Sequence, residues 1–250
     1  MVPHTYLEQG LSVLHARLRT PPTDRRPDRQ AEVRPFLTLS RETGAGATTL
    51  GRELLPRLDR EFPVPGHPWV LLDRDLLAHA LTHHQLPTSL ANYLPEDRIS
   101  EIQAAIGELV GLHPSLWQLE QKVAEAILQL AHVGQVILVG RAAHLITGDL
   151  PAGLHVRLVA STETRTARVA AALGSDPEQA AAHLAKTDDA RRRFVRKHFN
   201  REIDDPTSYD LIVNTDRVSA PAAASIVVAA LRERLAAARA QAQPEPVSAR

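Results

Sequence analysis

Five short runs of Val, Ile and Leu constrain the fold of this chain more than any other feature of its sequence. They lie at residues 36–40, 69–73, 135–140, 154–160 and 209–214, and stretches with helical spacing separate them. Short apolar runs of this kind are typical of buried strands that helices cover on both faces. The alternation of strands and helices predicts an α/β fold with a five-stranded parallel sheet and right-handed crossovers.

The regions around these runs predict how the chain is divided. Residues 1–35 are expected to form an N-terminal helix, over 5–18, and a linker rich in Pro and Arg. Residues 36–240 are expected to form one domain with a helical insert at 96–133, and 241–250 a disordered tail. Further helices are predicted at 48–60, 74–84, 161–173 and 220–240, and Asp176-Pro177 marks the start of another.

The charge balance and the absence of cysteine exclude several classes of protein. The chain has 29 Lys and Arg against 29 Asp and Glu, so it has no overall positive field for nucleic acid or an anionic membrane. It has no cysteine, which excludes disulfides and thiolate zinc sites and fits a reducing cytosol. The longest apolar run, 220–231, is too short to span a membrane, and the N-terminus lacks the apolar core of a secretion signal. We predict a cytoplasmic protein without nucleic-acid or membrane partners and leave its oligomeric state open.

The most informative segment is a glycine-containing loop after the first predicted strand. Residues 37–52 read L-T-L-S-R-E-T-G-A-G-A-T-T-L-G-R, a strand that runs through glycines into a helix. Glycines let backbone N–H groups turn inward around an anion, and the helix adds the positive end of its dipole. The segment predicts a phosphate-binding loop with the Thr48 hydroxyl placed to ligate Mg²⁺. The alternative is a glycine-containing turn that binds nothing.

The loop departs from the G-x-x-x-x-G-K-[ST] pattern of P-loop proteins. Gly46 and Thr48 fit, but Arg41 stands at the first glycine and Ala47 at the lysine. That lysine would offset the charge of the β- and γ-phosphates, so another side chain has to supply positive charge. The residues predicted to bind ATP are Arg41, Gly44, Ala45, Gly46, Ala47, Thr48 and Thr49.

Four regions of the chain resemble the cytidylate kinase-like family of P-loop proteins. The loop S-R-E-T-G-A-G-A-T-T-L-G-R is similar to the family's Ser-Arg-Glu, Gly-Ser-Gly-Gly loop, which also lacks the lysine. The later regions, which agree in order and spacing, are L-L-D-R-D-L-L (71–77), V-G-R-A-A-H-L-I (139–146), and K-T-D-D-A-R-R-R-F (186–194) with D-P-T-S-Y-D-L-I-V-N-T (205–215). Over about 36–234, the resemblance implies a three-layer, nucleoside-monophosphate-kinase-like fold. It also implies transfer of the γ-phosphoryl group of ATP, with Mg²⁺, to an acceptor, nominally CMP or dCMP.

Polar residues that follow two predicted strands are candidates for binding the phosphate acceptor. Asp73 and Arg74 follow the second strand and Arg141 follows the third, at the edge where open α/β sheets bind ligands. We predict that Arg74 and Arg141 hold the acceptor phosphate and that Asp73 orients the acceptor or ligates Mg²⁺ through water. The alternatives are an aspartate that caps the next helix and an arginine on the surface.

A basic segment, over about 176–205, is predicted to act as a lid. Residues 186–201 contain seven Lys and Arg, with Asp188 and Asp189 as the only acids before Arg201. Closely spaced like charges repel unless an anion lies between them, so a basic lid over ATP would supply the charge that Ala47 cannot. We predict that Arg191 and Arg196 contact phosphates and that Asp188 orients Arg191. A solvated helix face is the alternative.

These observations favour an ATP-dependent phosphotransferase, with Arg141, Asp188, Arg191 and Arg196 as the catalytic candidates. The cofactors are then ATP and Mg²⁺, and the partner is a small-molecule phosphate acceptor. Two alternatives stay open, a non-catalytic nucleotide-binding module and a P-loop kinase for another small molecule. Thr215 and Asp216 are expected near the adenine, and the histidines are assigned no role because they show no metal-ligand spacing.

Overall fold

The computed structural model describes residues 33–73, 116–140 and 142–242. Within these ranges, parallel strands form one five-stranded sheet in the order β2-β3-β1-β4-β5, with β1 at its centre. The strands are β1 (Phe36–Arg41), β2 (Val70–Leu72), β3 (Val136–Val139), β4 (Gly153–Val159) and β5 (Leu211–Asn214). Each strand overlaps one of the five apolar runs, so the predicted parallel sheet is confirmed.

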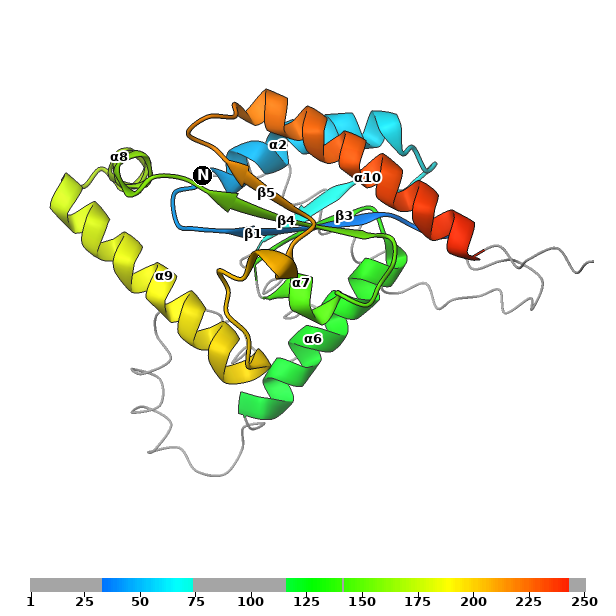
Figure 1. Ribbon diagram of the computed structural model, residues 1–250, viewed down its shortest axis with the longest axis horizontal. Helices are drawn as coiled ribbons and strands as arrows, with labels where there is room; N and C mark the ends of the chain where they lie inside the picture. The colour runs from blue at the N-terminus through cyan, green and yellow to red at the C-terminus, as the bar shows by residue number, and fades with distance from the viewer. Residues whose placement is uncertain (1–32, 74–115, 141, 243–250) are drawn as a thin grey trace, which may run out of the picture.

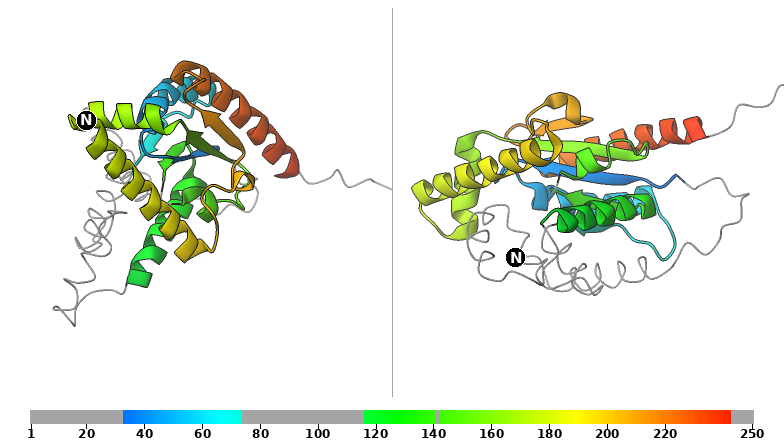
Figure 2. Two further views of the ribbon diagram at one scale, coloured as in Figure 1. Left: turned by 60° about the vertical axis from the view of Figure 1, so that its left-hand side comes forward. Right: turned by 90° about the horizontal axis from the view of Figure 1, so that it is seen from below.

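Helices cover both faces of the sheet, as Figure 1 shows. On one face α2 (Ala47–Glu61) packs against α10 (Ala220–Ala242), and on the other lie α6 (Leu116–Val133) and α7 (Ala143–Ile146). Next to the carboxyl end of β4, α8 (Thr162–Leu173) packs against α9 (Pro177–Phe199), and the 3₁₀ helix η1 (Pro206–Ser208) leads into β5 (Figure 2). This is the three-layer α/β arrangement that the sequence predicts.

The largest apolar core fills the layer between the sheet and helices α2 and α10. Leu50, Leu54 and Leu58 recur every four residues along α2, so they share the face that packs against the sheet. On β1, Leu37 and Leu39 point to the same layer. Burial of one such side chain contributes about 2 kcal/mol, so this layer holds the β1–loop–α2 connection rigidly in place.

The opposite face of β1 and β4 is buried but polar. Thr38 and Ser40 on β1 pair in register with His155 and Arg157 on β4. Arg157 is only 4% exposed, and a buried cation requires polar partners. Its Nη1 donates to Ser40 Oγ at 3.2 Å, and its Nη2 donates to the Asp204 carboxylate. Across β1 and β4 the sheet therefore carries an apolar layer on one face and a polar layer on the other.

Several predicted helix boundaries can be compared with the structure. Asp176 caps α9 by accepting a hydrogen bond from Gln179 N at 2.8 Å, and Pro177 is the first helical residue, as predicted. Helix α10 continues to Ala242, two residues past the expected boundary at 240, and the short α7 was not predicted. The helices expected at 5–18 and 74–84, the part of the helical insert before 116, most of the linker and the tail from 243 lie outside the described residues. None of the helices in the described ranges is long and apolar enough to cross a bilayer.

Candidate active site

The predicted phosphate-binding loop joins β1 to α2 through residues 42–46. Gly44 and Gly46 have left-handed φ angles of 79° and 87°. Helix α2 begins at Ala47, and no side chain caps its first turn by a hydrogen bond. An uncapped helix start beside such glycines offers backbone donors and a positive dipole end to an anion. The expected order of strand, glycine loop and helix is confirmed.

Gly44 is required by its backbone conformation and by its surroundings. A Cβ at this position would lie 2.7 Å from the Arg165 carbonyl oxygen, which is backbone of α8 and cannot move aside easily. Replacing Gly44 by alanine is expected to lower the free energy of unfolding by about 3 kcal/mol, because left-handed strain and the clash add. Urea unfolding measures the loss.

Gly66 offers a matched control for this substitution. Its φ angle is 73°, but a Cβ at this position would have no neighbouring atom within 4 Å. Gly66→Ala therefore carries only the conformational strain, about 1 kcal/mol. Equal losses in the two variants would contradict the close approach of the loop to α8.

The carboxylate of Asp188, on α9, binds the loop and two arginines. It accepts hydrogen bonds from Thr43 N at 2.8 Å and Thr43 Oγ1 at 2.6 Å. It also pairs with Arg165 of α8 at 2.6 Å and with Arg191 at 3.1 Å, which is the predicted contact between Asp188 and Arg191. Burial raises the pKa of the Asp188 carboxyl, but the Thr43 hydrogen bonds, Arg191 and Arg165 outweigh it and hold the pKa below the ordinary 3.8. Asp188 is therefore an anion at neutral pH that ties α8 and α9 to the loop.

Arg168 and Thr215 bind the other side of the loop. Arg168 Nη1 donates to Thr215 Oγ1 at 3.0 Å and to the Gly44 carbonyl at 3.4 Å. The Thr215 hydroxyl in turn donates to the Ala45 carbonyl at 3.1 Å. Thr215, which was expected near the adenine, directly follows β5 and thus joins the end of this strand to the glycine loop.

Arg41 is the last residue of β1 and extends toward the end of β3. A Cβ on Gly140, directly after β3, would collide with the Arg41 guanidinium, so the side chain passes over this glycine. Arg41 and Arg191 then line the same pocket. Arg41, which the sequence groups with the ATP loop, therefore lies between that loop and the β3 side of the sheet.

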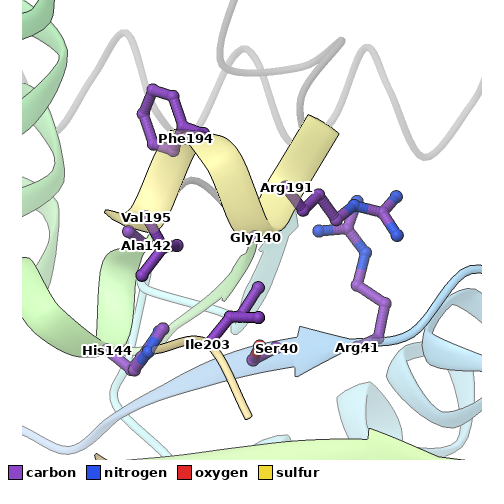
Figure 3. Close-up of a pocket in the computed structure, with 9 residues that line it drawn as sticks. All are labelled: Ser40, Arg41, Gly140, Ala142, His144, Arg191, Phe194, Val195 and Ile203. Carbon is purple, nitrogen blue, oxygen red and sulfur yellow. The ribbon is translucent and has the colours of Figure 1, made fainter. Parts of the chain in front are cut away.

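This pocket lies at the carboxyl ends of β1 and β3 (Figure 3). Figure 3 shows the Arg41 and Arg191 side chains close together at one end and His144 at the other, with Ile203 and Ser40 between them. The lining residues are Ser40, Arg41, Gly140, Ala142, His144, Arg191, Phe194, Val195 and Ile203. An adjoining pocket shares Arg41 and Arg191 and adds Glu42, Arg157, Asp188, Arg192 and Asp204. The polar layer of the sheet thus opens into a cationic pocket beside the loop.

The remaining predicted residues are distributed as follows. Ala47 is buried among core side chains, whereas Thr48 and Thr49 are exposed on the first turn of α2. Asp73 is half-buried directly after β2. Arg74 and Arg141 lie outside the described residues.

Arg196 is not brought to the loop. Its guanidinium donates to both carboxylate oxygens of Glu202, at 2.7 and 2.9 Å, and its side chain is 69% exposed. Arg192 and Asp204 form a similar pair at 3.5 Å on the same stretch. Two acidic residues just after α9, Asp204 and Glu202, thus neutralise part of the positive charge of the basic segment. The sequence analysis did not predict these ion pairs.

Four residues near the site were given no role from the sequence. They are His144, Arg157, Arg165 and Arg168. Arg157 could have been found, because a charged residue inside an apolar run is a signal of a buried polar function. The arginines of α8 carry no such signal, since a basic residue on a helix is usually solvated.

The architecture and this loop define a class of protein. A central strand leads through a glycine loop into a helix whose start is uncapped, in a five-stranded parallel sheet of order β2-β3-β1-β4-β5. The molecule is a P-loop protein with the nucleoside-monophosphate-kinase-like fold. Residues 36–217 match the cytidylate kinase-like family, and the chain belongs to that family.

Individual relatives are more distant. The chain is 28% identical over 116 residues to a cytidylate kinase of Methanothrix thermoacetophila, covering 46% of this chain and 65% of that protein. It is 30% identical over 120 residues to a cytidylate kinase of Pyrococcus horikoshii, covering 48% of this chain and 60% of that protein. The matched stretch thus spans less than two thirds of either relative. A solved structure of an uncharacterized protein from Eubacterium ventriosum has the same fold, with a TM-score of 0.55, 17% identity, and coverage of 80% of this chain and 99% of that one.

Proposed function

We propose that this protein is a cytoplasmic, ATP-dependent phosphotransferase that moves the γ-phosphoryl group of ATP to a nucleoside monophosphate, nominally CMP or dCMP. The observation that carries the proposal is the uncapped start of α2 with arginines from three other elements around its loop. These are Arg41 of β1, Arg165 and Arg168 of α8, and Arg191 of α9. Membership of the cytidylate kinase-like family supports it.

Phosphoryl transfer requires positioning and charge compensation more than covalent help from the protein. In our proposal the amides of Gly44 and Gly46 and the first turn of α2 hold the ATP phosphates, while Ala45 N donates within the loop to the Glu42 carbonyl at 3.1 Å. Arg191 supplies the charge that a lysine at Ala47 would supply, and Arg41 lies on the acceptor side of the transferred group. Asp188 is a positioning residue, because it fixes Arg191 and the loop together.

Magnesium fits this site as an ion carried mainly by the nucleotide. Within the described residues no three His, Asp or Glu side chains gather to hold a metal. Mg²⁺ accepts hard oxygen ligands and keeps several waters beside substrate phosphates, so one or two protein oxygens suffice. The exposed Thr48 hydroxyl on the first turn of α2 and the Asp73 carboxylate at the end of β2 would serve. When bound, the ion would offset charge on the β- and γ-phosphates.

The acceptor side is proposed to include Arg74 and Arg141, with the pocket between β1 and β3. The segment at 176–205 is proposed to act as a lid whose Arg191 and Arg196 reach the phosphates. For Arg196, this role requires its ion pair with Glu202 to open when ATP binds. No nucleic acid is proposed as a partner.

A non-catalytic nucleotide-binding module is the second candidate. It is favoured by the Asp188 carboxylate, which already occupies the Thr43 N–H, and by Ala47, which faces the core. Such a module would bind nucleotide without turning it over.

The test measures ATP consumption with CMP, dCMP, UMP, AMP and GMP, and with small hydroxyl compounds as acceptors. We expect turnover with at least one nucleoside monophosphate, with dependence on Mg²⁺. Binding of ATP without turnover of any acceptor would favour the non-catalytic module. Turnover of a hydroxyl compound alone would favour a kinase for another small molecule.

A further inference from the structure

His144, on α7, is a buried residue with a polar atom that the described part of the protein leaves unpaired. The side chain is 5% exposed, and its Nε2 is buried with no hydrogen-bond partner there. Buried polar atoms nearly always have a partner, and one without a partner costs stability. Because the unpaired nitrogen lowers the stability of the fold, we look for a role of this nitrogen in binding a ligand.

The orientation of the His144 ring is fixed by its neighbours. It stacks on Tyr209, with ring centroids 4.6 Å apart and an angle of 27° between the planes. Tyr209 is itself held, because its hydroxyl donates to the Ile203 carbonyl at 2.7 Å and lies 3.2 Å from Ser40 Oγ. The imidazole is therefore held in place before any ligand arrives.

The pocket that His144 lines has two chemically different ends. Arg41 and Arg191 form the cationic end, while Phe194, Val195 and Ile203 form an apolar wall. In Figure 3 His144 lies on the opposite side of the pocket from the two guanidinium groups, with Ile203 between them. A ligand with a phosphate at one end and an organic body at the other fits this division of charge.

The charge state of His144 limits what it can bind. Burial, with His155 and Arg157 nearby, lowers the pKa of the imidazole to about 3, so the ring is neutral at physiological pH. A neutral imidazole makes a hydrogen bond with a neutral amino, carbonyl or hydroxyl group without adding charge. Phosphate is better matched by the guanidinium groups.

We propose that His144 is a specificity-determining residue that hydrogen-bonds through Nε2 to the organic part of a phosphate-monoester acceptor, whose phosphate lies between Arg41 and Arg191. This inference rests on the proposed function, since it names how the acceptor of that reaction is held. The bond formed by the ligand would satisfy the nitrogen that the described part of the free protein leaves unpaired.

The test uses His144→Phe, which keeps an aromatic ring against Tyr209 and removes the nitrogens. Calorimetry compares the wild type and the variant with inorganic phosphate and with whichever of CMP, dCMP, UMP, AMP and GMP the wild type binds most tightly. We expect nucleotide affinity to fall about 5- to 10-fold, as for one lost hydrogen bond, and phosphate affinity to stay unchanged. The melting temperature should be equal or higher, because an unpaired buried nitrogen is gone.

Several outcomes would overturn the inference. Unchanged nucleotide affinity, an equal loss for nucleotide and phosphate, or a wild type that binds none of the five nucleotides would each do so. Binding that depends on His144 without any turnover would refute the proposed catalysis and leave the inference standing. If His144→Phe does not fold, ¹⁵N NMR spectra of the wild-type imidazole provide the test. The Nε2 resonance should shift when the nucleotide is added and stay unchanged when inorganic phosphate is added.

Discussion

Replacing Arg191 by alanine is expected to lower the rate of phosphotransfer about 100- to 1000-fold, the usual cost of removing a donor that stabilises developing charge. Arg191 Nη1 donates to Thr43 Oγ1 at 2.7 Å and to Asp188 at 3.1 Å, so the loop and α9 hold it in place. With alanine at position 47, this guanidinium is the proposed source of the missing positive charge. The free energy of unfolding should change by only about 1 kcal/mol, because Asp188 keeps its hydrogen bond with Thr43 and its ion pair with Arg165.

The same helix provides the control for Arg191. Arg193 is 68% exposed and pairs with Asp189 on the outer side of α9. Exposed pairs of this kind contribute little, so Arg193→Ala should change turnover by less than about twofold and stability by less than about 0.5 kcal/mol. Steady-state kinetics of both variants checks this. Equal losses of activity would mean that the basic helix acts through its overall charge, and an active Arg191→Ala would remove Arg191 from the catalytic set.

The loop could be predicted from the sequence because its signals are local. A buried strand, two glycines at left-handed positions and a helix start occur within twelve consecutive residues, 36–47. The strands could be predicted for the same reason, since a parallel sheet buried on both faces requires short continuous apolar runs. The order of the strands was not predicted from these runs.

The surroundings of the loop could not be predicted in the same way. Arg165 is more than 120 residues from Thr43, and only the path of α8 brings it to the loop. Arg41 was correctly singled out, but the direction of its side chain depends on Gly140, which follows a different strand. His144 gave no signal in the sequence, because an unpaired buried nitrogen is visible only when all neighbours are placed.

Replacing Asp188 by alanine is expected to lower the free energy of unfolding by about 3–5 kcal/mol, the typical cost of removing one partner from a buried ion pair. The variant leaves the buried Arg165 without its closest carboxylate, at 2.6 Å, and leaves Thr43 N without its acceptor. Arg165 retains a longer pair with Glu42, at 3.4 Å, so the lower part of the range is the better expectation. Turnover should fall as well, because Asp188 fixes both Arg191 and the loop.

The pH dependence of stability distinguishes the charge of Asp188 from its packing. Its pKa is lower in the folded protein than the ordinary 3.8, so the unfolded chain takes up the proton first as the pH falls. The stability that the ionised carboxylate provides is therefore complete well above pH 4 and is lost as the pH falls through and below that value. Asp188→Asn keeps the shape without the charge, so its deficit relative to the wild type should be constant near neutrality and shrink in acid.

Asp189 is the matched control for both Asp188 variants, since it is the next residue on α9 and its side chain is 50% exposed. Asp189→Asn should cost less than about 0.5 kcal/mol and leave turnover unchanged. Urea unfolding between pH 3.5 and 7.5 measures all three variants. A deficit of Asp188→Asn that stays the same in acid would mean that Asp188 stabilises the loop through hydrogen bonds alone. In that case the negative charge of Asp188 would not stabilise the arginines beside the loop. The conclusion that ion pairs of Asp188 tie α8 and α9 to the loop would then be wrong.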